Sequence, residues 1–525
     1  MTTYPGTIAR LSLAVAAMLL FTNPTFSQQL YDPAIWGDDL EPGERLHTDK
    51  AKHSAAGHPQ EWGYDILGVR HLTGRSWSRK RENTSGNANN TYVIYNKRVH
   101  AMAGGTVIAC WRNAPENAPA GSTHAQVTNR RIGIGGNFLW IEEDDGDRVL
   151  YAHAIPGTIP AGLCPHNGTL FPTQYATSDD QMPAQSHVAA ANHARVEAGQ
   201  FLMRVGNSGN SSEPHLHIHK INDGGAAVRF NFRRGLFSMW TNGGADLNNW
   251  NSYAGGPVPQ GPLVFWPPRR LTSEYARHGY PNESYQRLFL HLGDSGFQLS
   301  WIDTYSVGGK SFMNFVWHPA TSGWRASHLV SEADYQAHID ADERDHWDPV
   351  QIESSLEAGV RIRYSVTSVQ NKPGTWLARH GLIQNQHIEI RDRARKDGLK
   401  LASVSVVSIA SIRFYTVLYN QDDIGDWRVE SQIPEGGYQQ VYNTQLAAGR
   451  RVVYLNSYMH NGQPFISAIF ATKAGTDRVA RHGLSGPDYQ AAYNQFANGA
   501  RRTRTVTSFD NAQQQHRYAA VWAKP

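Results

Sequence analysis

Three histidines alternate with aliphatic residues between positions 214 and 219 (PHLHIH). Alternation of this kind is typical of a β-strand, whose successive side chains point to opposite faces. We therefore expect His215, His217 and His219 on one face of a strand, with the two aliphatic side chains on the other. Imidazoles two residues apart on one strand face can bind a single metal ion. A polar strand face without a ligand is the competing interpretation.

Other residues that bind metals lie at the ends of further predicted strands. Asp65 begins one strand, and His153 ends the strand 148–153 (RVLYAH), where period 2 places it on the face of Val149 and Tyr151. A glycine-rich loop at 205–211 (VGNSGNS) leads into the histidine strand. An acid, a single strand histidine and an H-x-H pair are the parts of a mononuclear zinc site, in which three protein ligands leave one position for water.

The order of these motifs resembles the lysostaphin-type zinc metallopeptidases, the group that includes LytM and LasA. The resemblance covers residues 50–235 and is carried above all by GNSGNSxxPHLH at 206–217. It implies a mainly antiparallel β catalytic domain with a groove, a Zn²⁺ cofactor, and cleavage of peptide bonds in peptidoglycan or other glycine-rich substrates. It also implies that Asp65 and His217 are zinc ligands and that His153 and His215 flank the reacting water. His219 is expected outside the ligand set, with a supporting role as one interpretation.

The first zinc ligand is the point at which this chain departs from the family pattern. Many members have a histidine four residues before the aspartate, and this chain has Glu61 there. His53, which precedes a serine, and His58 are the alternative ligands, and Glu61 could bind through oxygen. If none of the three binds zinc, the domain is a catalytically inactive relative that acts in cell-wall binding or adhesion.

The N-terminus has the layout of a secretory signal peptide. An apolar run at 11–21 follows Arg10, and small residues precede a predicted cleavage between Ser27 and Gln28. A buried N-terminal helix is the competing interpretation. The run is too short to span a bilayer and no other stretch reaches 18 apolar residues, so we expect a secreted protein without stable membrane insertion.

Only two cysteines are present, beside 24 histidines. In an oxidising compartment Cys110 and Cys164 can form a disulfide that closes a loop of about 55 residues; two free buried cysteines are the alternative. Two cysteines exclude a disulfide scaffold and a cysteine-based metal site, which leaves imidazole chemistry.

The C-terminal half is repetitive. The tetrapeptide ARHG begins at Ala276, Ala378 and Ala480, and a half-period of about 51 residues divides 273–525 into five units. In the last unit, a helical stripe at 488–499 precedes two alternating strands, which predicts an α-β-β unit with the ARHG histidine in a structural role at the helix entrance. The pattern resembles the bacterial tandem-repeat domain attached to secreted hydrolases of the polyglycine hydrolase type, which implies an accessory binding module.

Composition agrees with this division. Charged residues make up 18% of the 525 residues and aromatic residues 11%, with 48 glycines and 26 prolines, which favours a turn-rich, strand-leaning protein and excludes coiled coil, collagen and general disorder. The net charge of +4 gives no indication of a nucleic-acid partner. We expect a signal peptide at 1–27, a mainly β metallopeptidase domain at 28–240, a Gly/Pro-rich linker at 241–272 and α+β tandem repeats at 273–525. The sequence leaves the oligomeric state open.

Overall fold

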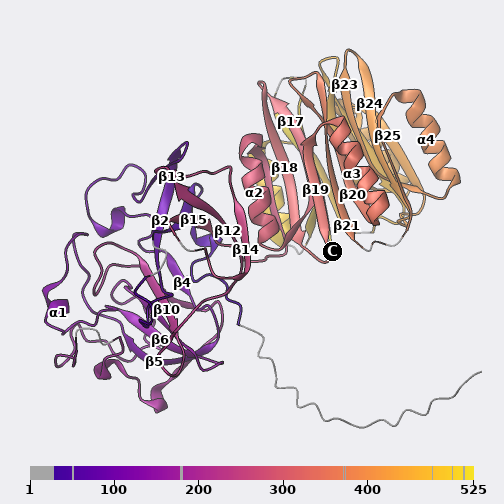
Figure 1. Cartoon of the computed structure of the whole chain (residues 1–525). Coiled ribbons are helices and arrows are strands. Elements are labelled where there is room, and N and C mark those ends of the chain that lie inside the picture. Colours follow the sequence, from indigo (N-terminus) through magenta and orange to yellow (C-terminus); the bar gives the residue numbers. More distant parts are fainter. Residues whose placement is uncertain are drawn as a thin grey trace, which may run out of the picture.

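The computed structural model describes residues 29–49, 53–177, 181–259, 261–370, 372, 374–475, 477–498, 501–511, 513 and 515–524. The predicted signal peptide lies outside these residues. The chain forms two bodies that lie side by side, an N-terminal one with a large β-sheet and a C-terminal one made of repeated small sheets (Figure 1). Within the described residues, no helix is both long and apolar enough to cross a membrane.

The N-terminal body is built on an antiparallel sheet in which the neighbours follow the order β13-β12-β15-β1-β2-β10-β7-β6-β5-β8, with β3, β11 and β14 attached at its sides. Strands β4 and β9 pair separately, and the helical segments are single short turns. The strands are β1 Glu44–Thr48, β2 Tyr64–Thr73, β3 Ser76–Ser78, β4 Arg98–His100, β5 Gly105–Trp111, β6 Phe138–Glu143, β7 Arg148–Ala152, β8 Ala194–Val196, β9 Phe201–Arg204, β10 Leu216–Ile221, β11 Ala227–Val228, β12 Phe232–Thr241, β13 Gly244–Ala245, β14 Asn251–Gly256 and β15 Leu263–Trp266. The helical turns are η1 Gly37–Asp39, η2 Asn89–Thr91, α1 Ala125–Thr128, η3 Ala184–Ser186 and η4 Ala190–Asn192.

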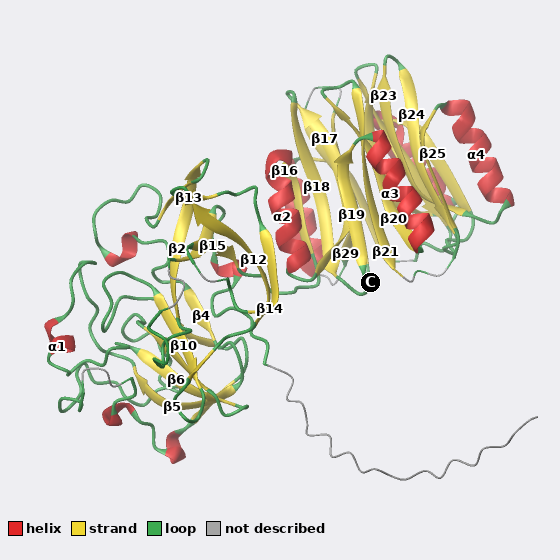
Figure 2. Ribbon diagram, viewed as in Figure 1, coloured by secondary structure: helices red, strands yellow, loops and turns green. Residues whose placement is uncertain are grey.

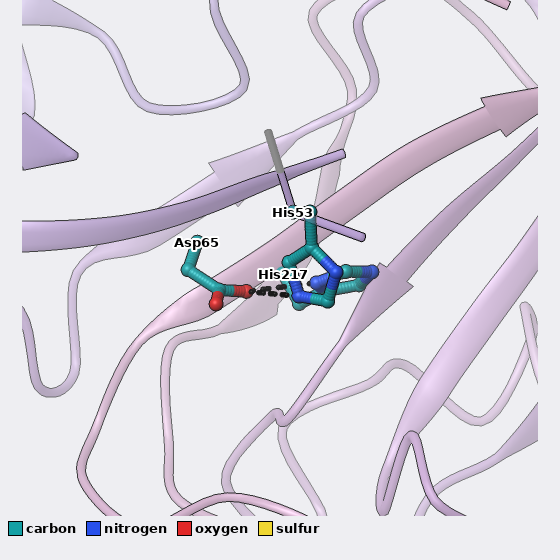
Figure 3. A group of neighbouring side chains, drawn as sticks. All are labelled: His53, Asp65 and His217. Atoms are coloured by element: carbon teal, nitrogen blue, oxygen red, sulfur yellow. Dashed lines mark hydrogen bonds and ion pairs between the residues drawn. The ribbon is translucent and has the colours of Figure 1, made fainter. Parts of the chain in front are cut away.

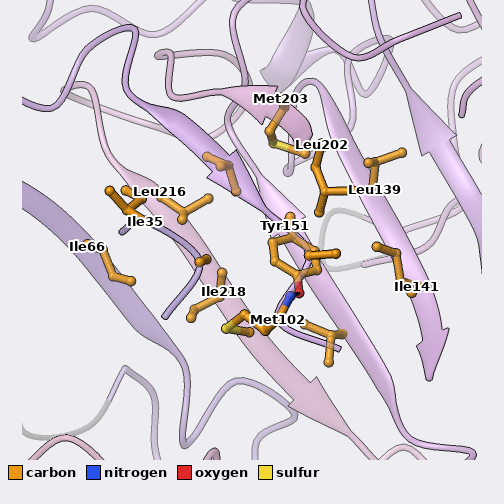
Figure 4. Close-up of a cluster of buried hydrophobic side chains, with 14 of the residues drawn as sticks. Ile35, Ile66, Met102, Leu139, Ile141, Tyr151, Leu202, Met203, Leu216 and Ile218 are labelled. Carbon is orange, nitrogen blue, oxygen red and sulfur yellow. Dashed lines mark hydrogen bonds between the residues drawn. The ribbon is translucent and has the colours of Figure 1, made fainter. Parts of the chain in front are cut away.

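One face of this sheet packs into the main hydrophobic core. Leu216 and Ile218 of β10 are fully buried there, and Ile66 of β2 and Tyr151 of β7 lie beside them on the neighbouring strands (Figure 4). The alternation in β10 therefore places its aliphatic residues in the core and its histidines on the opposite face, as the sequence predicts. This choice of face also fixes the register of β10 against both neighbours.

The predicted disulfide is present. Cys110 of β5 is bonded to Cys164, and both are completely buried in the main core. No cysteine is free among the described residues. The bond ties the sheet to the long segment between β7 and β8.

The segment 241–272 differs from the expected linker. Strands β14 and β15 lie within it, and both pair with β12, while β15 also pairs with β1. Val264 and Phe265 of β15 are buried. The glycines and prolines in this segment mark turns between strands, so this part of the chain belongs to the sheet.

The C-terminal body contains five three-stranded antiparallel sheets, each with one helix. Each unit runs strand, helix, strand, strand, and the first strand forms an edge of the sheet. The units are β16 Tyr275–Pro281, α2 Asn282–Asp294, β17 Phe297–Val307 and β18 Lys310–Pro319; β19 Trp324–Val330, α3 Glu332–Asp345, β20 Trp347–Glu357 and β21 Arg361–Gln370; β22 Trp376–Leu382, α4 Gln384–Lys396, β23 Lys400–Ile409 and β24 Ile412–Asn420; β25 Trp427–Pro434, η5 Glu435–Gly437, α5 Tyr438–Ala447, β26 Arg451–His460 and β27 Gln463–Ala471; β28 Arg478–Leu484, α6 Gly486–Asn498, β29 Arg502–Asp510 and β30 His516–Ala523.

The order within a unit therefore corrects the predicted α-β-β arrangement. The tetrapeptide ARHG lies on the first strand, which contains a β-bulge, and not at the helix entrance. Its histidine packs edge-on against the helix tyrosine of the preceding unit: His380 against Tyr335, and His482 against Tyr438. His278 of the first unit packs in the same way against Tyr489 of the last. The repeated histidine is thus a contact between units.

The five units form a closed ring. Each of the inner strands β17, β20, β23, β26 and β29 contacts the next, and β29 contacts β17 again. At the closure, the indole nitrogen of Trp301 donates a hydrogen bond to the backbone oxygen of Val506 over 2.7 Å. Helices α2, α3 and α4 lie outside the strands in Figure 2.

A repeated polar contact joins the inner strands. Each inner strand is an edge strand of its sheet, so its outward N–H groups need partners from elsewhere. A side chain of the next unit accepts from one of them. The pairs are Thr304 N to Glu353 (2.5 Å), Ser354 N to Ser405 (3.0 Å), Val406 N to Asn456 (3.1 Å) and Ser457 N to Thr507 (3.0 Å). Between the last and the first unit, the carboxylate of Asp303 accepts a hydrogen bond from the backbone N–H of Ser508.

The two bodies meet at an aromatic contact. The ring of Trp266 on β15 stacks on that of His291 on α2, with the ring centroids 3.8 Å apart. The guanidinium of Arg45 on β1 lies 3.5 Å from the same indole ring. Both Arg45 and His291 are buried, so the contact is shielded from water.

We expect Thr507→Val to destabilise the ring by about 2–4 kcal/mol. The substitution keeps the shape but removes the acceptor for Ser457 N and the hydroxyl that donates over 2.9 Å to the buried carboxylate of Asp303. Urea unfolding of the full chain measures the loss. Thr444→Val, at an exposed position on α5, is the matched control, and equal effects of the two substitutions would contradict the structural role of the polar contact.

Candidate metal centre

Strands β2, β10 and β7 lie side by side and position the candidate residues. Across these antiparallel pairs Asp65 lies opposite His217, which in turn lies opposite Ala152. Directly opposed residues share one face of a sheet, so Asp65 and His217 project from the face that is turned away from the main core. His153 follows Ala152 at the end of β7.

Three potential ligands come together on this face. The ligand atoms of His53, Asp65 and His217 all lie within 4.8 Å of one another (Figure 3). His217 Nδ1 is 2.8 Å from Asp65 Oδ1, and His53 Nε2 is 3.2 Å from the same oxygen. His53 belongs to the irregular segment between β1 and β2, so it reaches the site without support from the sheet.

The other two candidates for the first ligand lie outside this group. His58 is exposed, and its Nδ1 accepts a hydrogen bond from the backbone N–H of Gln60. The carboxylate of Glu61 accepts from the backbone N–H of Gly57 over 2.9 Å. Of the three alternatives left open by the sequence, the structure brings His53 to Asp65 and His217.

His153 and His215 lie beside the ligand group, with their ring centroids 4.5 Å apart. His153 Nδ1 is 2.8 Å from the backbone oxygen of Ser208, and His215 Nδ1 is 2.8 Å from that of Glu213. A carbonyl oxygen only accepts, so Nδ1 carries a proton in both rings, and the neutral form of each ring has its lone pair on Nε2. His215 Nε2 lies 3.5 Å from Asp65 Oδ1, facing the group.

The orientation of His153 corrects the strand alternation expected from the sequence. Val149 and Tyr151 point into the main core, while Leu150 and Ala152 line the site. His153 would continue the core face in a regular strand, but its φ is 71°, in the left-handed region that non-glycine residues seldom adopt. This local conformation turns the imidazole to the site.

His219 supports His217 from behind. Its Nδ1 lies 2.8 Å from His217 Nε2, and its ring packs edge-on against Trp140. In one tautomer His217 Nδ1–H donates to Asp65 Oδ1 and Nε2 accepts from His219; in the other, Nε2–H donates to His219 and the Nδ1 lone pair is available to a metal ion. One carboxylate oxygen and two imidazole nitrogens also form a donor set that suits catalytic zinc, so the residues fit this metal.

Burial sets the protonation of the group. Burial lowers the pKa of His217, His153 and His219 below the ordinary histidine value, which keeps these rings neutral near pH 7. Burial opposes ionisation of Asp65, but hydrogen bonds with His217 and His53 outweigh it and hold the pKa of Asp65 well below its usual range. Neutral imidazoles and an ionised carboxylate are the forms that bind metal ions.

One cavity of about 280 Å³ is lined by the three potential ligands and by the two histidines beside them: His53, Asp65, His217, His153 and His215. Gln60 and Gln181 also line it, and their side chains are hydrogen bonded to each other. Gln181 comes from the long segment between β7 and β8, far away in sequence and without a motif, so sequence reasoning missed it. The cavity can admit a peptide segment beside the ligands and the histidine pair.

The glycine-rich loop holds this arrangement through close backbone contacts. Ser208 Oγ donates to the backbone oxygen of Ala154 and accepts from the backbone N–H of Asn137. Gly136 has a φ of 63°, and a Cβ atom there would come within 2.3 Å of Ser208. Only glycine permits this approach, which places the Ser208 carbonyl against His153.

Comparisons with known proteins give results for both bodies. A family model described as "Polyglycine hydrolase-like, structural repeat" matches residues 272–320, 373–422, 425–473 and 475–525. These matches cover four of the five units of the ring. No curated protein matches the chain.

Solved structures with similarity to the chain include an antimicrobial peptidase and a zinc-containing peptidase. The catalytic domain of lysostaphin from Staphylococcus simulans is 14% identical to this chain. The alignment covers 37% of this chain and 92% of the lysostaphin domain, with a TM-score of 0.18. A zinc-containing peptidase from Vibrio cholerae is 16% identical over 38% of this chain and 39% of its own, with a TM-score of 0.17. The catalytic domain of the M23 protein EnpA from Enterococcus faecalis, as an A109H mutant, is 19% identical over 30% of this chain and 92% of its own, with a TM-score of 0.12. TM-scores this low carry no weight for function, which rests on the site itself.

We expect His53→Ala to lower zinc affinity by at least about tenfold, because the ligand group loses one of its three members. His58→Ala, a nearby exposed histidine, is the matched control and should keep its zinc. Metal analysis after dialysis against a weak chelator compares the zinc-to-protein ratios. Loss of zinc in the His58 variant alone would assign the first ligand to His58 instead.

Proposed function

We propose that this protein is a secreted zinc metalloendopeptidase that hydrolyses peptide bonds in peptidoglycan or other glycine-rich substrates. The observation that carries the proposal is the convergence of a three-residue ligand group and two histidines with free Nε2 atoms in one cavity. A metal site with only a structural role would have no need of the histidine pair beside it.

His53, Asp65 and His217 would hold the Zn²⁺ ion. When bound, zinc supplies Lewis acidity toward a peptide carbonyl oxygen and toward water. His219 would hold His217 through the 2.8 Å contact between the two rings, accepting a hydrogen bond from Nε2 while Nδ1 of His217 binds the metal. Three protein ligands leave the remaining coordination available to water and substrate.

The histidine pair would carry the proton transfers. The Nε2 atom of His153 or His215 accepts a proton from the attacking water and later delivers it to the leaving amine. The other ring, when protonated, donates a hydrogen bond to the developing oxyanion. The Ser208 and Glu213 carbonyl oxygens keep both rings oriented throughout, since each holds an Nδ1–H.

The surroundings of the site allow a peptide backbone to approach the histidines closely. Gly135 and Ala152 line the cavity beside the histidines, and neither has a side chain beyond Cβ. The predicted cleavage after Ser27 and the Cys110–Cys164 disulfide suit an extracellular protein. The ring of repeats would serve as an accessory binding module next to the peptidase body.

We expect the protein, after removal of residues 1–27, to bind one zinc ion and to release new amino termini from purified peptidoglycan or from oligoglycine. His215→Ala and His153→Ala should each lower kcat/KM by about 10²–10⁴-fold with the zinc retained, because each removes a proton-transfer group. His58→Ala is the control and should keep both zinc and activity. A zinc-free wild-type protein without activity on either substrate would support an inactive binding protein instead.

Zinc removal should also lower the stability of the N-terminal body. With free zinc at about 100 times its Kd, the bound ion contributes about 2.7 kcal/mol. Differential scanning calorimetry with and without a chelator measures the shift in Tm, and added zinc should restore it. The His53→Ala variant should respond little to the chelator, whereas a response equal to the wild type would place the zinc elsewhere.

A further inference from the structure

A second cavity, of about 340 Å³, lies inside the ring of repeats. Residues from all five inner strands line it. On each strand, one lining residue lies two positions before the side chain that accepts the hydrogen bond between units. At this level the five strands carry Trp301, Gln351, Ser403, Tyr454 and Thr505. The cavity is therefore part of the closed ring, and no single unit could form it.

Several buried polar atoms in its wall lack partners. Gln351 Oε1, Ser403 Oγ and Thr505 Oγ1 make no hydrogen bond with any described residue. The three residues are only 3%, 2% and 2% exposed. Each unsatisfied buried polar atom costs about 1–3 kcal/mol, and these three lie beneath the cavity surface with almost no accessible area of their own.

Two arginines at the cavity give it a positive charge. Arg478 and Arg504 line it. Arg478 Nε donates to the backbone oxygen of Ala474 and Arg504 Nη2 to that of Lys524 over 2.8 Å, but neither guanidinium forms an ion pair within the part of the chain that the structure describes. Their neighbours differ in this respect: Arg501 pairs with Asp477, and Arg450 pairs with Asp426. Burial and, to a smaller extent, the charge of Arg504 lower the pKa of Arg478.

One carboxylate lines the same cavity. Asp422 accepts hydrogen bonds from Lys372 Nζ over 2.8 Å and from Asn420 Nδ2 over 2.9 Å, so its charge is already compensated. Glu274 acts on Arg504 from a distance, but it is engaged by Thr503 and His318. An occupant with negative charge would thus relieve the repulsion between Arg478 and Arg504, which water alone does not.

We propose that this cavity binds an oxyanion group, a carboxylate or a phosphate, at the guanidinium groups of Arg478 and Arg504. Guanidinium groups bind both oxyanions through paired N–H donors. The site would give the ring its own ligand, independent of the metal centre. Peptide carboxyl ends and phosphate esters of wall polymers both present this chemistry.

Isothermal titration calorimetry of the full mature chain tests the proposal with two probes, inorganic phosphate and N-acetylglycine. We expect saturable binding of at least one probe, and the stronger probe identifies the source. Arg478→Gln and Arg504→Gln should each weaken binding by about tenfold, and the corresponding Arg→Lys variants should recover part of it. Arg428→Gln, at an exposed position on β25, is the charge-matched control and should bind as the wild type does.

Because phosphate can also bind zinc, the titration is repeated in the His217→Ala variant. Retained binding there, together with loss in the arginine variants, supports the ring site even if the metal centre proves inactive. Absence of saturable binding of both probes, or equal weakening by Arg428→Gln, would overturn the proposal. Tm values of all variants show whether a loss reflects unfolding.

Discussion

The pairing of β10 with β2 and β7 is the constraint on which the candidate metal centre depends. Burial of Leu216 and Ile218 in the core leaves the histidines only the opposite face. A shift of the strand by one residue would exchange the two faces, so the hydrophobic core itself keeps His217 opposite Asp65. The core thus determines which side chains meet, and the loops at the strand ends add His53, His153 and His215.

The sequence predicted those parts of the site that depend on regular strands. His215, His217 and Asp65 could be placed by period 2 and by motif. The face of His153 could not, because a single residue in the left-handed region reverses the alternation of β7. The choice among His53, His58 and Glu61 also lay beyond local patterns, since the irregular segment between β1 and β2 decides which side chain reaches Asp65. Gln181 enters from a long insertion that has no periodic signal.

The fold shows the same division between local and long-range information. The period of about 51 residues predicted five units, and the structure contains five small sheets. The sequence did not predict the first strand of each unit, because the β-bulge interrupts the alternation of polar and apolar residues. The tetrapeptide ARHG was therefore assigned to the start of the helix that follows it. Residues 241–272 suggested a linker because their glycines and prolines occupy turns, although β14 and β15 pair with strands far away in sequence. Pairing between distant strands leaves little trace in composition.

Ring closure through Trp301 and Val506 places the first and last units in the same relation as any two neighbours. An open stack of repeats can lengthen or shorten by one unit, because only the terminal copy changes its surroundings. A closed circle lacks that freedom, since an added or deleted copy would alter the angle at every junction. Duplication within this part of the gene would therefore be tolerated only if all five junctions adapted together, and the number of copies is set by geometry.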